Sequence, residues 1–386
     1  MEKYKPAIVI AAYNRKHSLK RLLDSLAKSI YQSEVTLVIS IDKSNNEDVL
    51  DIANSFEWNN GEKVILKHNQ NLGLKKHILE CGNLTKTYGS IILLEDDLYV
   101  SPFFYIYALD ALQYYSTDTN IAGISLYAHS FNVHAKLPFT PVKEDSSVFF
   151  MQLPSSWGQA WTIEQWNNFT LWFNSDKNNN NYQTSAIPTN IASWPTSSWL
   201  KIFTKYIIEN NKYFAYPYVS LTTNFGDAGV NFGRKSSYVQ VVLQNIEIKY
   251  EFKKFEDANC VYDSYFEMLP SKLKLKADEL SNYDFEVDLY GYKPLLNFNK
   301  PYFLTTQNCK VYEKSYGLDF KPIEFNVFEE NSGVDIFLVK RADFKYNTKK
   351  LSKSILFEYY YRMPVIGELF NLLMLKIRQN IYDKIS

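Results

Sequence analysis

The sequence of 386 residues predicts an α/β fold in which a mostly parallel central sheet carries helices on both of its faces. Two observations in the first 130 residues support this prediction. Short runs of β-branched and other apolar residues alternate with segments of helical periodicity, and polar residues follow the apolar runs. Strands that alternate with helices form βαβ units, whose strands pair in parallel. The predicted strands are 7–13, 35–41, 63–67, 89–94 and 121–126, and the predicted helices lie within 19–30, 45–52, 74–87 and 101–115.

The spacing of side chains justifies these helices and strands. Leucines recur every three or four residues between 19 and 26, with Lys and Arg between them, which is typical of a helix with one buried face. Ser101 can cap the start of a helix, and Pro102 fits its first turn because the ring fixes the backbone there. Uninterrupted apolar runs such as 91–94 indicate strands that are buried on both faces.

Composition narrows the class of protein. Lys plus Arg equals Asp plus Glu at 42 each, so the net charge is zero, which argues against a general nucleic-acid-binding protein. Aromatic residues make up 16% of the chain and suit stacking as well as core packing. Cys81, Cys260 and Cys309 match no metal or redox spacing, which favours a reducing, cytoplasmic compartment. The first residues lack a signal-peptide core, and no apolar run is long enough to span a membrane.

The segment 91–97 is the most informative part of the sequence. Four apolar residues run directly into Glu95, Asp96 and Asp97. Acids at the carboxyl end of such a strand lie in the crevice where open α/β sheets bind ligands. Adjacent carboxylates repel one another, so a positive charge should compensate them, most simply a divalent cation that is held together with substrate phosphates. The alternative is an acidic loop that only ends a strand.

The remainder of the chain divides by pattern. Residues 150–235 are less regular and contain most of the tryptophans, and the asparagine run 178–181 is typical of a solvated loop. Beyond about residue 240, short aromatic and β-branched runs predict a β-rich region. The predicted domains are therefore a catalytic domain at 1–238, a β-rich accessory region at 239–350 and a basic amphipathic helix at 351–386.

The C-terminal helix combines apolar residues with Lys376, Arg378 and Lys384, and three further lysines come shortly before or at its start. A basic amphipathic helix of this kind can lie on an anionic membrane surface. Alternatively, the helix packs on the core of its own chain or on a second copy of the protein.

Five segments carry a resemblance to a known family, and they occur in order along residues 5–235. They are 11–15 (AAYNR), Asp42, 71–77 (NLGLKKH), 95–98 (EDDL) and 224–230 (NFGDAGV). Together they resemble glycosyltransferases of the Rossmann-like GT-A fold, in particular the family 2-like enzymes of bacterial surface polysaccharide synthesis. They are also similar to the N-acetylglucosaminyltransferase I group.

The resemblance implies a nucleotide-sugar site and a division of labour among the acids. Asp97 would hold Mn²⁺ or Mg²⁺ against the two phosphates, Asp96 would bind the ribose hydroxyls, and Glu95 would bind the transferred sugar. The implied donor-binding residues are Ala11, Tyr13, Asn14, Arg15, Asp42, Gly73, Lys76, His77, Glu95 and Asp96. For several of these, ordinary structural roles stay open. The alternatives are that Asp42 only forms a turn and that Arg15, Lys76 and His77 are surface residues.

An inverting transfer also needs a carboxylate that takes a proton from the acceptor hydroxyl. In related enzymes this acid lies near a helix start flanked by tryptophans, but the matching stretch 193–199 contains none. Asp227 and Glu164 are therefore the candidates for the catalytic base, and the glycines around Asp227 favour it slightly. Trp157, Trp161 and Phe225 are candidate acceptor contacts, although core packing is an equally good interpretation.

The sequence therefore predicts a metal-dependent, inverting hexosyl- or N-acetylhexosaminyltransferase. Its donor would be a nucleoside diphosphate sugar, with uridine diphosphate as the expected nucleotide. Its acceptor would be a glycan or lipid-linked glycan of surface polysaccharide synthesis, at the cytoplasmic face of the inner membrane. Two alternatives stay open. A sugar-phosphate nucleotidyltransferase is disfavoured because residues 11–15 lack a glycine-rich basic loop, and a non-catalytic relative could bind a nucleotide sugar or a partner protein. A homo-oligomer is also open.

Overall fold

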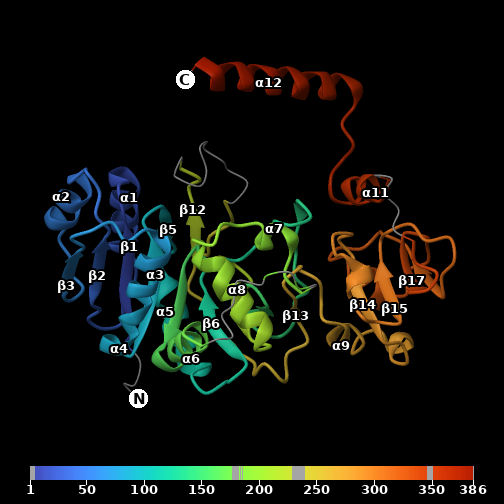
Figure 1. Ribbon diagram of the computed structural model, residues 1–386, viewed down its shortest axis with the longest axis horizontal. Coiled ribbons are helices and arrows are strands. Elements are labelled where there is room, and N and C mark those ends of the chain that lie inside the picture. The colour runs from blue at the N-terminus through green and yellow to red at the C-terminus, as the bar shows by residue number, and fades with distance from the viewer. Residues whose placement is uncertain are drawn as a thin grey trace.

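The computed structural model describes residues 5–175, 182, 184, 186–227, 240–345 and 351–385, and Figure 1 shows helices packed around a large sheet. This sheet has nine strands in the order β13-β9-β11-β6-β10-β4-β1-β2-β3. Its strands are β1 (Ala7–Ala12), β2 (Leu37–Ile41), β3 (Lys63–Lys67), β4 (Ser90–Glu95), β6 (Ile121–Ser125), β9 (Val148–Met151), β10 (Gln159–Thr162), β11 (Tyr213–Pro217) and β13 (Val261–Tyr262).

The half of the sheet formed by β4, β1, β2 and β3 is parallel throughout, as the alternation of strands and helices predicts. Its connections contain α1 (Lys16–Leu26), α2 (Asp48–Ser55), α3 (Leu74–Asn83) and α4 (Thr85–Tyr88), and α5 (Phe104–Tyr114) leads on to β6. All six residues of β1 are buried, because this strand has a neighbour on each side and protein on both faces. The predicted α/β fold with a mostly parallel sheet is confirmed.

The other half of the sheet is mixed. β10 runs antiparallel to both β4 and β6, β11 pairs in parallel with β6, and β9 is antiparallel to β11. The helices of this half are α6 (Ile163–Phe173), α7 (Thr189–Ala192) and α8 (Trp199–Glu209). Two small ribbons lie outside the main sheet, β5 (Leu98–Val100) with β12 (Thr222–Asn224), and β7 (Phe131–Asn132) with β8 (Leu137–Pro138).

Two apolar cores cover the two faces of the large sheet. Ile8 and Ile10 belong to one core and Val9 to the other, because successive side chains of a strand point to opposite faces. Aromatic side chains of residues 250–255 pack against the first core, and β13 joins the large sheet in parallel with β9. Residues 240–262 therefore belong with the large sheet, although the sequence prediction ends the catalytic domain at residue 238.

The predicted β-rich region contains a second sheet in the order β14-β15-β17-β16. Its strands are β14 (Phe285–Asp288), β15 (Tyr302–Thr305), β16 (Lys314–Tyr316) and β17 (Ile336–Lys340). Short helices accompany it, namely α9 (Pro270–Leu273), α10 (Phe325–Phe328) and the 3₁₀ turns Asp278–Leu280 and Leu295–Asn297.

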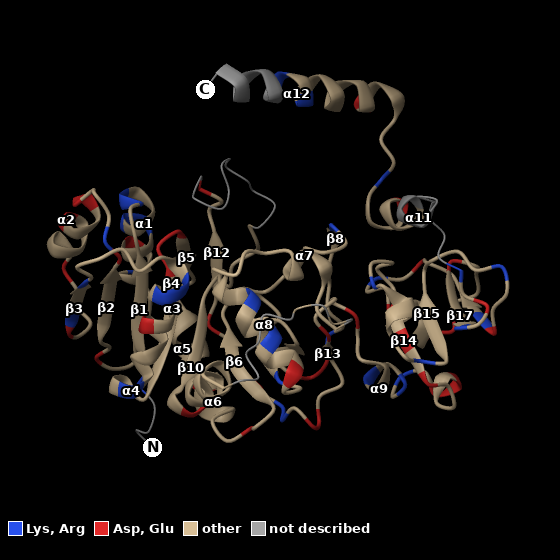
Figure 2. Ribbon diagram, in the orientation of Figure 1, with Lys and Arg blue, Asp and Glu red and all other residues tan. Residues whose placement is uncertain are grey.

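The C-terminal segment forms two helices where the sequence prediction has one. α11 (Leu351–Tyr360) and α12 (Ile366–Ile385) are separated at Pro364, whose ring and missing N–H do not fit a helix interior. α12 stands apart from the body of the protein (Figure 2). Among the helices of the described ranges, none has both the length and the apolar character that a bilayer-crossing helix needs.

Candidate active site

The predicted ligand-binding edge is formed where the parallel strands end. Ala11 of β1 is buried and lies opposite Glu95 of β4 in the strand register. The chain continues from the acids into β5, which pairs with β12 and so places Asn224 opposite Leu98. Segments that are more than 120 residues apart in the sequence therefore meet beside Glu95, Asp96 and Asp97. We call this side of the sheet the acid edge.

Arg15 bridges two of the acids at this edge. Its Nη1 donates a hydrogen bond to Asp97 Oδ2 at 2.7 Å, and its Nη2 donates to Asp96 Oδ1. The backbone N–H of Tyr13 donates to Asp96 Oδ2 at 3.1 Å, while Asn14 between them is exposed. The structure thus brings these predicted donor-binding residues together. The positive charge next to the acids is therefore the guanidinium of Arg15, whereas the sequence analysis expects a metal ion there.

Burial and mutual repulsion raise the pKa of two of the acids. Burial and the neighbouring Asp97 raise the pKa of Glu95 to about 8. Burial also raises the pKa of Asp96 to about 6, although Arg15 opposes this shift. For Arg15 itself, burial is outweighed by the nearby carboxylates, so its pKa lies above the usual value. The acid edge therefore has room for additional positive charge.

Asp97 provides the observation that bears on a metal ion. The residue is 8% exposed, Oδ2 accepts a hydrogen bond from Arg15, and Oδ1 is buried without a hydrogen-bond partner. An unpaired carboxylate oxygen is costly unless a donor or a cation arrives, and oxygen is the ligand that Mg²⁺ and Mn²⁺ prefer. No three His, Cys, Asp or Glu side chains of the described residues form a metal site by themselves. Asp97 therefore fits a cation whose other ligands come from phosphates or water.

Asp42 follows β2 and accepts hydrogen bonds from the loop between β3 and α3. Its Oδ1 accepts hydrogen bonds from the backbone N–H groups of Lys43 and Leu72 at 2.9 and 2.8 Å, and Oδ2 accepts from Gly73 at 3.0 Å. Gly73 has a φ of 73°, a conformation that favours glycine. In this arrangement the carboxylate of Asp42 holds residues 72–73 in place, whereas the resemblance implies that it binds the donor.

The two remaining candidates on α3 have different environments. Lys76 is exposed near the start of the helix. His77 is 3% exposed, and its Nε2 lies 2.8 Å from Ser40 Oγ, which also lies 3.1 Å from Nε2 of His68. Burial lowers the pKa of His77 to about 4, so the ring is neutral at pH 7. The structure places His77 inside the protein and not on the surface of the helix.

Asp227 is held against α1 by two residues that the sequence analysis missed. Ser18 Oγ donates to Asp227 Oδ2 at 2.8 Å, and Arg21 forms an ion pair with the same oxygen. The guanidinium carbon of Arg21 lies 3.9 Å from the centre of the Phe225 ring. The ion pair and hydrogen bonds outweigh partial burial and lower the pKa of Asp227. Ser18 and Arg21 are three residues apart on the helix that follows the predicted loop 11–15, a signal that could have identified them.

The candidate acceptor contacts separate into one buried and two half-buried residues. Trp161 has no exposed surface and packs against Trp166 with ring centres 4.9 Å apart, so its predicted role as a sugar platform is wrong. Trp157 is half-buried, and its ring lies 4.6 Å from that of Tyr127 at a steep angle. Phe225 is also half-buried. Trp157 and Phe225 therefore keep surface that a ligand can contact.

Glu164 lies at the other end of the sheet. In the antiparallel pairing of β10 with β4, Gln159 is opposite Leu93 and Thr162 is opposite Ser90, so the chain runs away from the acid edge before it reaches Glu164. Ser90, opposite Thr162, is five positions from Glu95 along β4, which corresponds to roughly 17 Å at the rise of a strand. The structure does not bring this second base candidate to the acids, whereas Asp227 follows β12, which does reach them.

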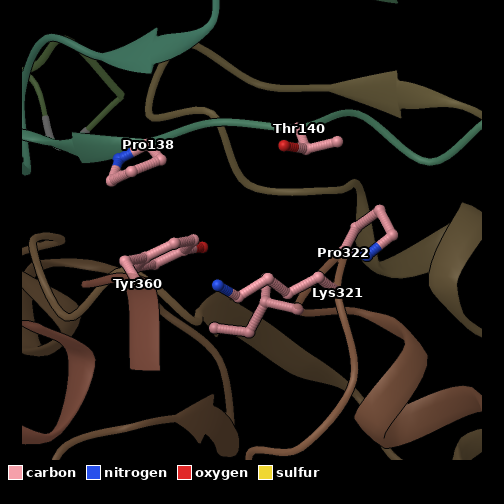
Figure 3. A pocket seen from close by; sticks show the side chains of 6 residues that line it. Pro138, Thr140, Lys321, Pro322 and Tyr360 are labelled. Carbon is pink, nitrogen blue, oxygen red and sulfur yellow. The ribbon is translucent and has the colours of Figure 1, made fainter. Parts of the chain in front are cut away.

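A separate hollow of about 140 Å³ lies between β8 and the base of α11 (Figure 3). It is lined by Pro138, Thr140, Lys321, Pro322, Ile323 and Tyr360. None of these residues belongs to the acid edge, so this hollow is not the nucleotide site that the sequence predicts.

Residues 7–159 match the sequence model of a family described as glycosyl transferase family 2. Over these residues the chain is similar to family 2 glycosyltransferases. The match includes β1 to β9, the loop with Arg15, and all three acids, and it ends at the first residue of β10. The predicted resemblance to family 2 glycosyltransferases is confirmed over this range. A search of curated proteins found no match to the chain.

Several solved structures are similar to part of this chain. Residues 1–349 of S. aureus TarS share 13% identity at a TM-score of 0.37, over 56% of this chain and 59% of that one. The mannosyltransferase PcManGT from Pyrobaculum calidifontis, in complex with GDP-Man and Mn²⁺, shares 12% identity at 0.30, over 42% and 46%. GalNAc-T7 with UDP, GalNAc and Mn²⁺ shares 15% identity at 0.40, over 57% and 43%. The chain spans less than two thirds of the length of each.

Proposed function

We propose that this chain is a metal-dependent glycosyltransferase that moves a sugar from a nucleoside diphosphate, with uridine diphosphate as the expected carrier, to a glycan or lipid-linked glycan. One observation carries the proposal. In the range that matches glycosyl transferase family 2, Asp97 of the acid edge presents a buried carboxylate oxygen without a partner, next to an arginine that can bind phosphate.

The residues of the acid edge divide the work as follows. Asp97 holds a divalent cation, Mn²⁺ or Mg²⁺, which when bound neutralises charge on the departing diphosphate as a Lewis acid. Asp96 and Glu95 bind the ribose and the transferred sugar. In the absence of ligand, Arg15 holds Asp96 and Asp97 in place through two ion pairs. With a cation bound to the acids, the guanidinium would be available to bind the diphosphate.

The proton of the acceptor hydroxyl goes to Asp227 in this proposal, and the transfer inverts the anomeric centre. The ion pair with Arg21 keeps Asp227 ionised at neutral pH, which a base requires. Its position after β12 places it on the side of the sheet where the acids lie. The half-buried rings of Trp157 and Phe225 offer apolar faces for an acceptor sugar.

The test is hydrolysis and transfer of uridine diphosphate sugars, measured with Mn²⁺ and again with a chelator. We expect Mn²⁺-dependent turnover that is lost in Asp97→Asn. Asp227→Asn should lose transfer to a glycan acceptor and still bind donor, whereas Glu164→Gln, the control at the other end of the sheet, should behave like the wild type. Donor binding without turnover under all acceptors tested, or equal turnover in chelator, would contradict the proposal.

A further inference from the structure

α12 is the most exposed apolar element of the described chain. Every side chain that the structure describes on this helix is exposed except the half-buried Glu368. Ile366 is 86% exposed, and Phe370 and Leu375 are 62% and 60% exposed. Large apolar residues at this density are covered in a stable protein, by its own core, by a partner or by lipid. In the described part of the chain, no segment covers them.

The charge of the segment indicates which cover fits. Residues 345–386 contain eight Lys and Arg against three Asp and Glu, whereas residues 1–344 have five more acidic than basic residues. The chain as a whole is neutral, so positive charge is concentrated beside the exposed apolar helix. Each Lys or Arg near an anionic bilayer strengthens binding to its surface. An anionic membrane surface therefore complements both the charge and the apolar side chains.

The distribution of apolar residues around α12 disfavours a pair of helices. Ile366, Phe370, Leu373 and Ile377 form one stripe, with Leu369 and Leu372 extending it on one side and Met374 on the other. At 3.6 residues per turn these positions span roughly 200° of the circumference. A two-helix seam covers only the narrow a and d stripe, so a second copy would leave much of this surface in water. A helix embedded in the bilayer interface can bury the wider arc.

α11, which precedes α12, is packed against the body of the protein. This contact restricts where α12, and a membrane bound to it, can lie. Leu356 of α11 is buried, Tyr360 stacks on Tyr290 with ring centres 6.1 Å apart, and the hydroxyl of Tyr359 donates to the carbonyl of Phe320. A linker of five residues then leads to α12. Figure 1 shows α12 on the side toward which β12 points, and the pairing of β12 with β5 puts the acid edge on that side too.

We propose that α12 lies in the interface of an anionic bilayer and turns the acid edge toward it, so that the acceptor is a lipid-linked saccharide. The second part of this inference rests on the proposed function. A saccharide that is anchored in the bilayer stays close to the membrane surface. An active site that faces the same surface can reach it without extracting the lipid.

The first experiment measures sedimentation of the full chain with vesicles of phosphatidylcholine alone and with 30% phosphatidylglycerol. We expect binding to the anionic vesicles, weakened by high salt, and at least tenfold weaker binding for the variant Leu369→Ser, Phe370→Ser, Leu373→Ser. The control variant Val242→Ser, Val334→Ser removes apolar residues that are 83% and 64% exposed elsewhere and should bind like the wild type. Unchanged vesicle binding of the α12 variant would overturn the proposal. The proposal would also be overturned if the wild type were a dimer that bound no vesicles and the α12 variant were a monomer.

The second experiment tests the orientation. A fluorophore on Lys16→Cys, near the acid edge, and one on Glu164→Cys, at the opposite end, are compared in vesicles that carry a quencher on the lipid head group. We expect stronger quenching at position 16, and equal or reversed quenching would overturn the orientation. Hydrolysis of donor in solution separates the two proposals, because the α12 variant should retain it in full. If the wild type does not hydrolyse the donor, the proposed function is contradicted. Vesicle binding would still test the membrane proposal independently.

Discussion

Two regions of this protein crowd carboxylates around a single cation, and they differ in how well the oxygens are satisfied. At the acid edge, Glu95, Asp96 and Asp97 surround Arg15. In the C-terminal region, the fully buried Lys293 forms ion pairs with Asp263 and Glu286 and lies close to the buried Glu267. The buried Asp288 completes this second group, which we call the Lys293 cluster.

The Lys293 cluster is saturated by donors of its own chain. Asp288 Oδ1 accepts from the backbone N–H groups of Tyr292 and Lys293 at 2.7 and 2.8 Å, and Oδ2 accepts from Gln307 at 2.9 Å. Glu267 accepts from the N–H of Tyr290 at 2.8 Å. No oxygen of this cluster is without a partner among the described buried atoms, whereas Asp97 Oδ1 is. Acid content alone therefore does not distinguish these two clusters, whereas the unpaired oxygen of Asp97 does.

The largest effect should come from breaking the saturated cluster. Lys293→Met leaves buried carboxylates without their cation, and removal of one partner from a buried pair costs about 3–5 kcal/mol. We expect the free energy of unfolding, measured by urea denaturation, to fall by about this amount. The control is Lys300→Met, which removes an exposed pair with Asp284 and should cost less than about 1 kcal/mol. Equal losses in the two variants would contradict a structural role for the Lys293 cluster.

The acid edge should respond in the opposite way. Asp97→Asn removes the proposed cation ligand and relieves repulsion with Glu95, so we expect donor turnover to fall at least about 100-fold, a loss typical of a group that stabilises charge in the transition state. The urea midpoint should stay the same or rise. A variant that is unstable but active would show that Asp97 is structural and that the comparison between the two regions fails.

Glu324 is a buried acid whose pKa is raised mainly by burial. This side chain is 2% exposed, Oε2 has no partner, and burial raises its pKa to about 7. Because the folded-state pKa lies above the unfolded value, the folded state holds the proton more tightly, and this contribution to stability is lost as pH rises from about 4.5 to about 7. Glu324→Gln should therefore gain stability relative to the wild type at pH 8 but not at pH 4.5, by at most about 3 kcal/mol. Parallel pH profiles of the urea midpoints would contradict this.

Arg15→Gln should produce the smallest effects, of opposite sign for two ligands. Without the guanidinium, Asp96 and Asp97 lose their competing cation, so Mn²⁺ alone should bind more tightly. Uridine diphosphate in the presence of Mn²⁺ should bind about tenfold more weakly, since an arginine–phosphate contact is lost. Calorimetry measures both affinities. A change of the same sign for both ligands would show that Arg15 only orders the acids.

The features that the sequence predicted are those encoded locally. The parallel pairing of the first strands follows from their alternation with helices, and the acids at 95–97 come directly after an apolar strand, so both could be identified from short segments. The split of the C-terminal helix has an equally local cause in Pro364, although the prediction overlooked it. A single residue such as Pro364 can thus determine where a helix ends.

The features that the sequence could not provide depend on distant partners. Arg21 and Asp227 are 206 residues apart, and their ion pair exists because β12 returns to β5. Trp157 and Trp161 are four residues apart and chemically identical, yet only the second lies within the core, because it belongs to β10 between two strands. His77 reads as an exposed helical residue until Ser40, on another strand, is placed beside it.

The most direct test of the central claim is calorimetric titration of uridine diphosphate into the wild type and Asp97→Asn, each with Mn²⁺ and with a chelator. The account predicts that Mn²⁺ tightens binding of the nucleotide to the wild type at least about tenfold and has no such effect on Asp97→Asn. If the chelator-treated wild type bound the nucleotide as tightly as the Mn²⁺-loaded protein, Asp97 would not be a cation ligand.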